Sequence, residues 1–104
     1  MIKKENKPKF PSVYRIIFRC AAWKTKSERY YTENHSSDAL ADIYHAFHRG
    51  RMHAHKITIL DIQEYDSYSN LWVSRMVEAL QQLPDDIDLQ TITIKENKII
   101  LRKG

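Results

Sequence analysis

The most constraining feature of this sequence is one amphipathic segment at residues 36–50, SSDALADIYHAFHRG, with β-type segments on both sides of it. Its apolar residues have the i, i+3, i+4, i+7 spacing of a single helix face: Leu40, Ile43, Tyr44 and Phe47. Ser36 or Ser37 can cap the first turn, and Gly50 is placed to end the last one. The segment therefore predicts a helix with one apolar face to bury.

The flanking segments have the two-residue alternation of strands. VYRIIFRCAAW, starting at residue 13, and ERYYT, starting at residue 28, predict a hairpin whose first strand turns Tyr14, Ile16 and Phe18 to one face. KITILDIQ at 56–63 predicts a central strand, with Ile57 and Ile59 on the face opposite to Thr58, Leu60 and Ile62.

Two further elements are expected in the second half of the chain. Val73, Met76, Val77 and Leu80 form a second helical stripe, which predicts a helix from Ser67 or Ser69 to Leu83. LQTITIKENKIILRK at 89–103 predicts a hairpin that turns at Glu96 and Asn97 and pairs Ile94 with Ile99. The resulting order is ββαβαββ, a two-layer α+β sandwich with a mainly antiparallel sheet and two helices on one face.

The chain has 104 residues, enough for one domain at 12–104, with residues 1–11 as a flexible basic arm. The arm contributes four cations: Lys3, Lys4, Lys7 and Lys9. The chain has only two glycines, too few for a glycine-rich phosphate loop, and we expect no cofactor. Cys20 is the only cysteine, which excludes an intramolecular disulfide, and no apolar run is long enough for membrane insertion. We therefore expect a cytoplasmic protein.

Four of the five histidines lie in the stretch HAFHRGRMHAHK at 45–56. His45 and His48 are three residues apart on the predicted helix, and His53 and His55 alternate in the extended segment after it. Converging pairs of this kind can offer imidazoles to Zn²⁺, Ni²⁺ or Cu²⁺. No carboxylate within the stretch offsets a dication, and its neighbouring cations repel one, so we expect no metal site.

The same stretch suits phosphate better, because Arg49, Arg51 and Lys56 can bind phosphate oxygens and the imidazoles of His53 and His55 can donate to them. Residues 1–56 hold twelve Lys and Arg against five Asp and Glu, which is consistent with a polyanion-binding side. A helix C-terminus also attracts cations through its dipole, so a purely structural role of these residues stays open.

The face of the sheet away from the helices offers two hypotheses. Arg15 and Arg19, with Arg29 and Tyr31 if the register allows, have the composition of a platform for single-stranded nucleic acid. Four aliphatic residues on that face instead suggest a covering partner, which would be a second copy or another protein: Ile17, Ile57, Ile59 and Ile100. A separate cluster of Tyr65, Tyr68 and Trp72 is expected to pack along the second helix, with a peptide-binding or base-stacking site as the alternative.

Residues 13–64 resemble the LX-type ribosomal proteins of the archaeal large subunit in their order of strand hairpin, helix, basic exit and Ile-rich strand. The resemblance rests on YRIIFRC, SSDALADIYHAFHRGRMHAHK and ITILDIQEY, covers about half of the chain and includes no signature motif. It implies contact with rRNA through Arg49, Arg51 and Lys56.

Catalytic chemistry has little support, because no nucleophile elbow or metal-loop spacing occurs. The sequence favours a small non-catalytic binding module that contacts the RNA or DNA backbone through the basic helix exit and the N-terminal arm. The alternative is a protein–protein interaction adaptor or accessory protein, which would dimerise through the apolar open face of the sheet.

Overall fold

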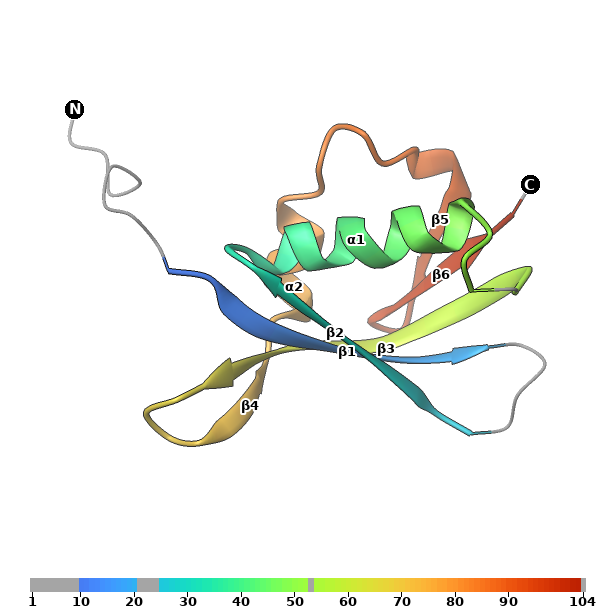
Figure 1. Ribbon diagram of the computed structural model, residues 1–104. Coiled ribbons are helices and arrows are strands. Elements are labelled where there is room, and N and C mark those ends of the chain that lie inside the picture. The colour runs from blue at the N-terminus through green and yellow to red at the C-terminus, as the bar shows by residue number, and fades with distance from the viewer. Residues whose placement is uncertain (1–9, 21–24, 53, 104) are drawn as a thin grey trace, which may run out of the picture.

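An antiparallel sheet carries both helices on one of its faces (Figure 1). The computed structural model describes residues 10–20, 25–52 and 54–103. The strands are β1 (Ser12–Cys20), β2 (Ser27–Glu33), β3 (Lys56–Asp66), β4 (Leu71–Ser74), β5 (Ile92–Lys95) and β6 (Lys98–Arg102). The helices are α1 (Ser36–His48), α2 (Met76–Gln81) and the short 3₁₀ helix η2 (Leu89–Thr91).

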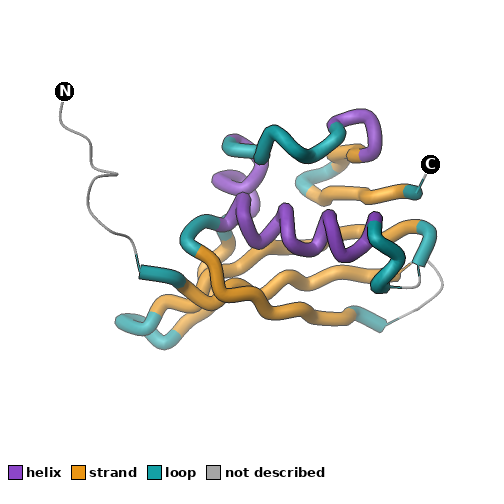
Figure 2. Tube along the Cα trace, turned by 45° about the horizontal axis from the view of Figure 1, so that its top comes forward, coloured by secondary structure: helices purple, strands orange, loops and turns teal. Residues whose placement is uncertain are grey.

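The described strands form one sheet in the order β2-β1-β3-β6-β5, and every neighbouring pair is antiparallel. β3 is central: β1 lies along one side of it, while β6 and then β4 pair with successive parts of its other side. Figure 2 shows the strands as one layer with the helices as a second layer against it. The predicted α+β fold with a mainly antiparallel sheet is therefore confirmed.

The alternation predicted for β1 is also confirmed. Tyr14, Ile16, Phe18 and Cys20 are buried beneath the helical layer, whereas the residues between them point to the other face of the sheet. Leu40, Ile43 and Phe47 of α1 are fully buried against this surface. A pattern of period two on the strand and of period 3.6 on the helix thus builds a single core.

α1 begins one residue earlier than a serine cap would allow. Its N-cap is His35, which makes no side-chain cap hydrogen bond, and both Ser36 and Ser37 are buried in the first turn. At the other end Gly50 has a positive φ of 76°, and its amide donates to the carbonyl of Phe47. The amide of Arg51 donates to the carbonyl of Ala46, so α1 ends in a Schellman motif, as the position of Gly50 predicts.

The predicted faces of β3 are wrong in one respect. Ile57, Ile59 and Ile62 are all fully buried under the helices, although Ile62 is an odd number of residues from the other two. The reason is a β-bulge: Phe18 pairs with Ile59 but Ile17 pairs with Asp61, so Leu60 is an extra residue in β3. Ile57 and Ile59 therefore do not belong to the open face.

The long second helix predicted from Ser67 or Ser69 to Leu83 is wrong. Its first part is a turn followed by β4, and only the short α2 is helical. The Asp66 carboxylate accepts hydrogen bonds from the amide of Tyr68 and the hydroxyl of Ser69, and Asn70 has a φ of 59°. These are the hydrogen bonds and conformation of a tight turn, which reverses the chain before a helix can start.

The C-terminal hairpin has the predicted register, with Ile92 opposite Leu101 and Ile94 opposite Ile99. Glu96 and Asn97 both have positive φ, as a two-residue turn requires. The basic arm predicted at residues 1–11 lies outside the described residues except for its last two positions, 10 and 11. No helix in the described ranges is long and apolar enough to cross a membrane.

Candidate nucleic-acid interface

A cavity of about 330 Å³ lies between β2 and the last turns of α1. We call it the basic groove, and it is lined by Arg29, Tyr31, Asp42, His45, Ala46, Arg49 and Arg51. A second hollow of about 270 Å³ shares Arg29 and Arg51 with it and reaches the buried side chains of Phe18 and Met52. Three of the predicted cations therefore meet at one site.

The local structure explains how these guanidinium groups come together. The Schellman motif turns the chain directly after α1, so Arg49 and Arg51 lie on either side of Gly50 at the helix end, and both are exposed. Arg29 comes from β2, and its guanidinium donates to the hydroxyl of Tyr31 at 3.4 Å. Since Arg15 pairs with Tyr30, Arg29 and Tyr31 point to the helical side and not to the open face.

The charges of the basic groove are unbalanced. Neither Arg49 nor Arg51 forms an ion pair with any residue in the described part of the chain. Asp42 is the one carboxylate among the lining residues, and it shares a hydrogen bond with the carboxyl group of Glu33. That hydrogen bond, with burial, raises the pKa of Glu33 to about 7. The groove consequently offers three guanidinium groups to a ligand against a single carboxylate that is already engaged.

The histidines that the structure describes in the stretch 45–56 do not converge. His45 Nε2 lies 2.7 Å from Oδ2 of Asp86, His55 is exposed at the surface, and His53 lies outside the described residues. The Nε2 atom of His48 is buried and has no hydrogen-bond partner among the described residues. Burial, followed by the charges of Lys103 and His45, lowers the pKa of His48. Within the described ranges, no three His, Cys, Asp or Glu side chains gather to hold a metal ion.

Three other predicted cations that the structure describes, Lys56, Arg15 and Arg19, do not line the basic groove. Lys56 begins β3 opposite Arg102, while Arg15 and Arg19 alternate on the open face of β1. The four arm lysines, Lys3, Lys4, Lys7 and Lys9, are outside the described residues. The described members of the predicted binding set are thus divided between the two faces of the sheet.

The aromatic residues predicted to pack along a second helix lie elsewhere: Tyr65 and Trp72 are on the open face of the sheet beside Arg15 and Tyr30, while Tyr68 is exposed in the turn. The guanidinium of Arg15 lies 4.3 Å from the ring centroid of Trp72, and the rings of Tyr30 and Tyr65 pack edge-on against the same indole. The sequence predicts Trp72 on a long helix, whereas it belongs to strand β4 of the sheet. The signal that locates it is the turn-forming run DSYSN between two apolar segments.

Only two of the four aliphatic residues predicted to form an interface on the open face lie there. Ile17 and Ile100 are partly buried on the open side, but Ile57 and Ile59 are fully buried in the core. Placing the last two on the open face is therefore wrong, because the sheet register points them at α1.

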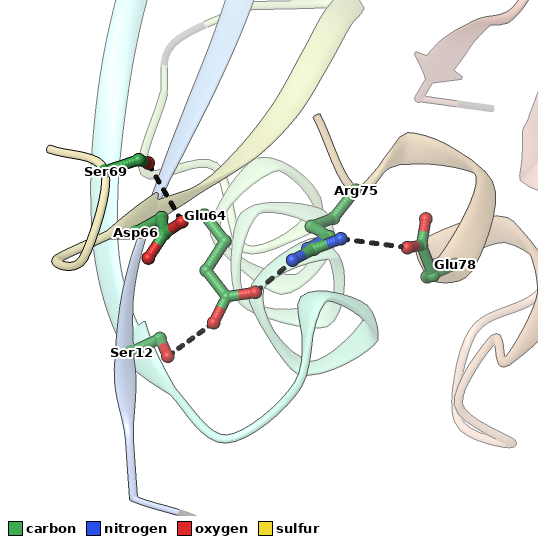
Figure 3. Close-up of polar contacts among 6 residues, drawn as sticks. All are labelled: Ser12, Glu64, Asp66, Ser69, Arg75 and Glu78. Atoms are coloured by element: carbon green, nitrogen blue, oxygen red, sulfur yellow. Dashed lines mark hydrogen bonds and ion pairs between the residues drawn. The ribbon is translucent and has the colours of Figure 1, made fainter. Parts of the chain in front are cut away.

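A third cavity, of about 290 Å³, is lined by Tyr14, His35, Ser36, Glu64, Arg75, Glu78 and Gln82. Figure 3 shows its polar contacts: Glu64 accepts hydrogen bonds from Ser12 Oγ at 2.6 Å and from Arg75 Nε at 3.0 Å, and Arg75 also pairs with Glu78. Burial, followed by the charge of Glu64, raises the pKa of Tyr14 to about 12. These contacts join β1, β3 and α2, so they stabilise the fold at the point where the sheet meets the second helix.

Comparison of the chain with known protein families, with curated proteins and with solved structures finds no match. The resemblance to LX-type ribosomal proteins therefore gains no support.

Proposed function

We propose that this protein is a non-catalytic binding module that contacts the RNA or DNA backbone through the basic groove. The observation that carries the proposal is the meeting of Arg29, Arg49 and Arg51 around one cavity without an ion pair to Arg49 or Arg51 among the described residues. Guanidinium forks bind phosphate oxygens in pairs, and phosphate contacts supply most of the affinity in nucleic-acid binding.

The origin of the three arginines distinguishes a ligand site from a helix-dipole effect. Arg49 and Arg51 follow the C-terminus of α1, where the helix dipole alone attracts cations. Arg29 belongs to β2 and is not a dipole partner, yet it lines the same cavity. A third cation from a separate element favours an anionic ligand, and the arm lysines would extend its electrostatic reach.

The test is fluorescence anisotropy with labelled RNA and DNA at about 50 and 200 mM salt, the range over which counterion release is measured. Arg49→Gln/Arg51→Gln should weaken binding to all sequences and lower the slope of log K against log salt by about 1.5, since roughly two phosphate contacts are lost. Lys95→Gln/Lys98→Gln, which removes two exposed charges from the β5–β6 hairpin, is the matched control. If the two double variants lose the same affinity, binding depends on the total charge of the protein and not on the basic groove.

A second candidate function is a protein-interaction adaptor that pairs with a copy of itself. Ile17 and Ile100, with Leu60 at the bulge, leave apolar area on the open face, and Val13 is 41% exposed there. Such a dimer would show a concentration-dependent mass that salt hardly changes, because apolar burial is not screened. We place either function in a reducing cytoplasm, a proposal that the single, buried Cys20 supports.

A further inference from the structure

The aromatic cluster on the open face spans four strands. Tyr30 belongs to β2, Arg15 to β1, Tyr65 to β3 and Trp72 to β4. The ring centroids of Tyr65 and Tyr30 lie 5.4 Å and 5.9 Å from that of Trp72, and the Arg15 guanidinium lies over the indole. We call these four residues the aromatic platform.

A chain of hydrogen bonds fixes the platform on the sheet. Ser74 Oγ donates to Asp61 Oδ1 at 2.7 Å, and Gln63 Nε2 donates to Asp61 Oδ2 at 2.9 Å. The side-chain oxygen of Gln63 in turn accepts from Arg15 Nε at 2.8 Å. Because Asp61 thereby holds Gln63 and Gln63 holds Arg15, the cation is oriented before any ligand arrives.

Exposure and charge indicate what the platform recognises. Tyr30 is 53% exposed and Tyr65 is 36% exposed, and both helices lie on the other face of the sheet (Figure 1). Arg15 and Arg19 lie on the same face of β1, so cations accompany the rings, while the carboxylate of Glu28 accepts a hydrogen bond from the Tyr30 hydroxyl at 2.6 Å. Rings that stack on bases, next to cations that neutralise phosphates, are the surface that binds unpaired nucleotides.

We propose that the aromatic platform stacks the bases of single-stranded nucleic acid. This inference rests on the proposed function, because it names the class of nucleic acid that the module takes. A duplex hides its base faces by stacking, so it can use the basic groove but not the platform. Arg29 and Tyr30 are consecutive residues of β2, an edge strand, and point to opposite faces. One strand that passes around this edge reaches both surfaces.

The experiment measures the emission of Trp72 in a Trp23→Phe background, where Trp72 is the one tryptophan left in the sequence. The protein is titrated with a single-stranded oligothymidylate and with an abasic oligonucleotide of the same length, which has the same phosphates but no bases. We expect the oligothymidylate to quench Trp72 and to bind more tightly, while the abasic strand leaves the emission unchanged.

Two variants separate stacking from charge. Tyr30→Leu should lower affinity for the oligothymidylate roughly 5- to 100-fold, the range found when a stacking ring is removed, and should leave the salt slope unchanged because no cation is lost. Trp72→Leu should do the same. Tyr68→Leu is the matched control, since Tyr68 is 99% exposed in the turn and contacts no ring of the platform. Circular dichroism checks that each variant is folded.

The outcomes distinguish this inference from the proposed function. If the oligothymidylate and the abasic strand bind equally well, and Arg49→Gln/Arg51→Gln loses affinity for both, the platform is overturned and the groove is kept. Weakening by Tyr30→Leu but not by the arginine variants would keep the platform and overturn the groove. If neither oligonucleotide binds, the platform is overturned, and the groove is overturned as well if the anisotropy titrations with RNA and duplex DNA also show no binding. A mass that doubles with concentration and reverts in Ile100→Glu would show that a second copy covers the face, and would overturn the platform.

Discussion

Glu33 and His48 respond to pH with opposite effects on stability. The pKa of Glu33 is raised from 4.5 to about 7 by its hydrogen bond to Asp42, so the folded state binds more protons than the unfolded state between these values. The contribution of Glu33 to the free energy of unfolding is therefore fully present below pH 4.5 and is lost as pH rises through about 7. The pKa of His48 is lowered from 6.5, mainly by burial, so its contribution is lost as pH falls below 6.5.

We predict that Glu33→Gln removes the first of these two effects. The amide can keep the hydrogen bond to Asp42 without titrating. The variant should therefore be more stable than wild type at pH 8 but not at pH 5, as measured by thermal unfolding. Taking the difference between variant and wild type cancels the contribution of His48. Asp85→Asn, which removes an exposed carboxylate in the loop after α2, is the control. The prediction fails if Glu33→Gln gives the same difference at both values of pH.

Gly50 is the residue at which backbone conformation matters most. Its φ of 76° is unfavourable for side chains with a Cβ, whereas the added atom would meet only Lys103 Nζ at 3.8 Å, which is ordinary contact. We predict that Gly50→Ala costs about 1–2 kcal/mol of unfolding free energy through the backbone alone. Gly50→Asn should cost less, because asparagine tolerates this conformation. Urea unfolding of the two variants measures the difference, and equal costs would contradict the conformational explanation.

At the scale of elements, the β5–β6 hairpin combines a correct register with a suboptimal turn. Glu96 and Asn97 have φ values of 53° and 61°, and the first position suits glutamate poorly. We predict that Glu96→Asn/Asn97→Gly, which introduces the favoured Asn-Gly pair, raises stability by roughly 0.5–1 kcal/mol. Thermal unfolding measures the gain. An unchanged or lower melting temperature would mean that the turn is not limiting.

At the scale of the whole molecule, the sheet separates the two proposed binding surfaces. The basic groove lies on the helical side and the aromatic platform on the open side, so they share no side chain. We therefore predict that Arg49→Gln and Tyr30→Leu lower the free energy of binding to single strands additively, within about 0.5 kcal/mol. Anisotropy titrations of the two single variants and the double variant measure this. A larger deviation would show that the two surfaces are coupled.

The sequence predicts the fold class and much of the core, because alternation on β1 and the stripe on α1 report burial directly. It also predicts that Arg49 and Arg51 lie at the helix exit, since Gly50 marks the end of α1. It does not predict that Arg29 joins them, because that depends on the register of β1 against β2. It predicts that Tyr65 and Trp72 cluster, but places them along a helix and not on the sheet for a local reason: the hydrogen bonds of Asp66 outweigh the helical spacing of Val73 and Met76.

Because Leu60 is the extra residue of a bulge, β3 can lose one residue at this position without changing which face its other side chains occupy. Removing Leu60 would leave Ile59 facing the core, Asp61 facing outward and Ile62 facing the core, which is the regular alternation of an unbulged strand. Deleting a residue between Ile57 and Ile59, or between Ile62 and Glu64, would instead turn one part of the strand over. Chains descended from a common ancestor with this one can therefore differ by a one-residue gap at this point while every neighbouring side chain keeps its environment.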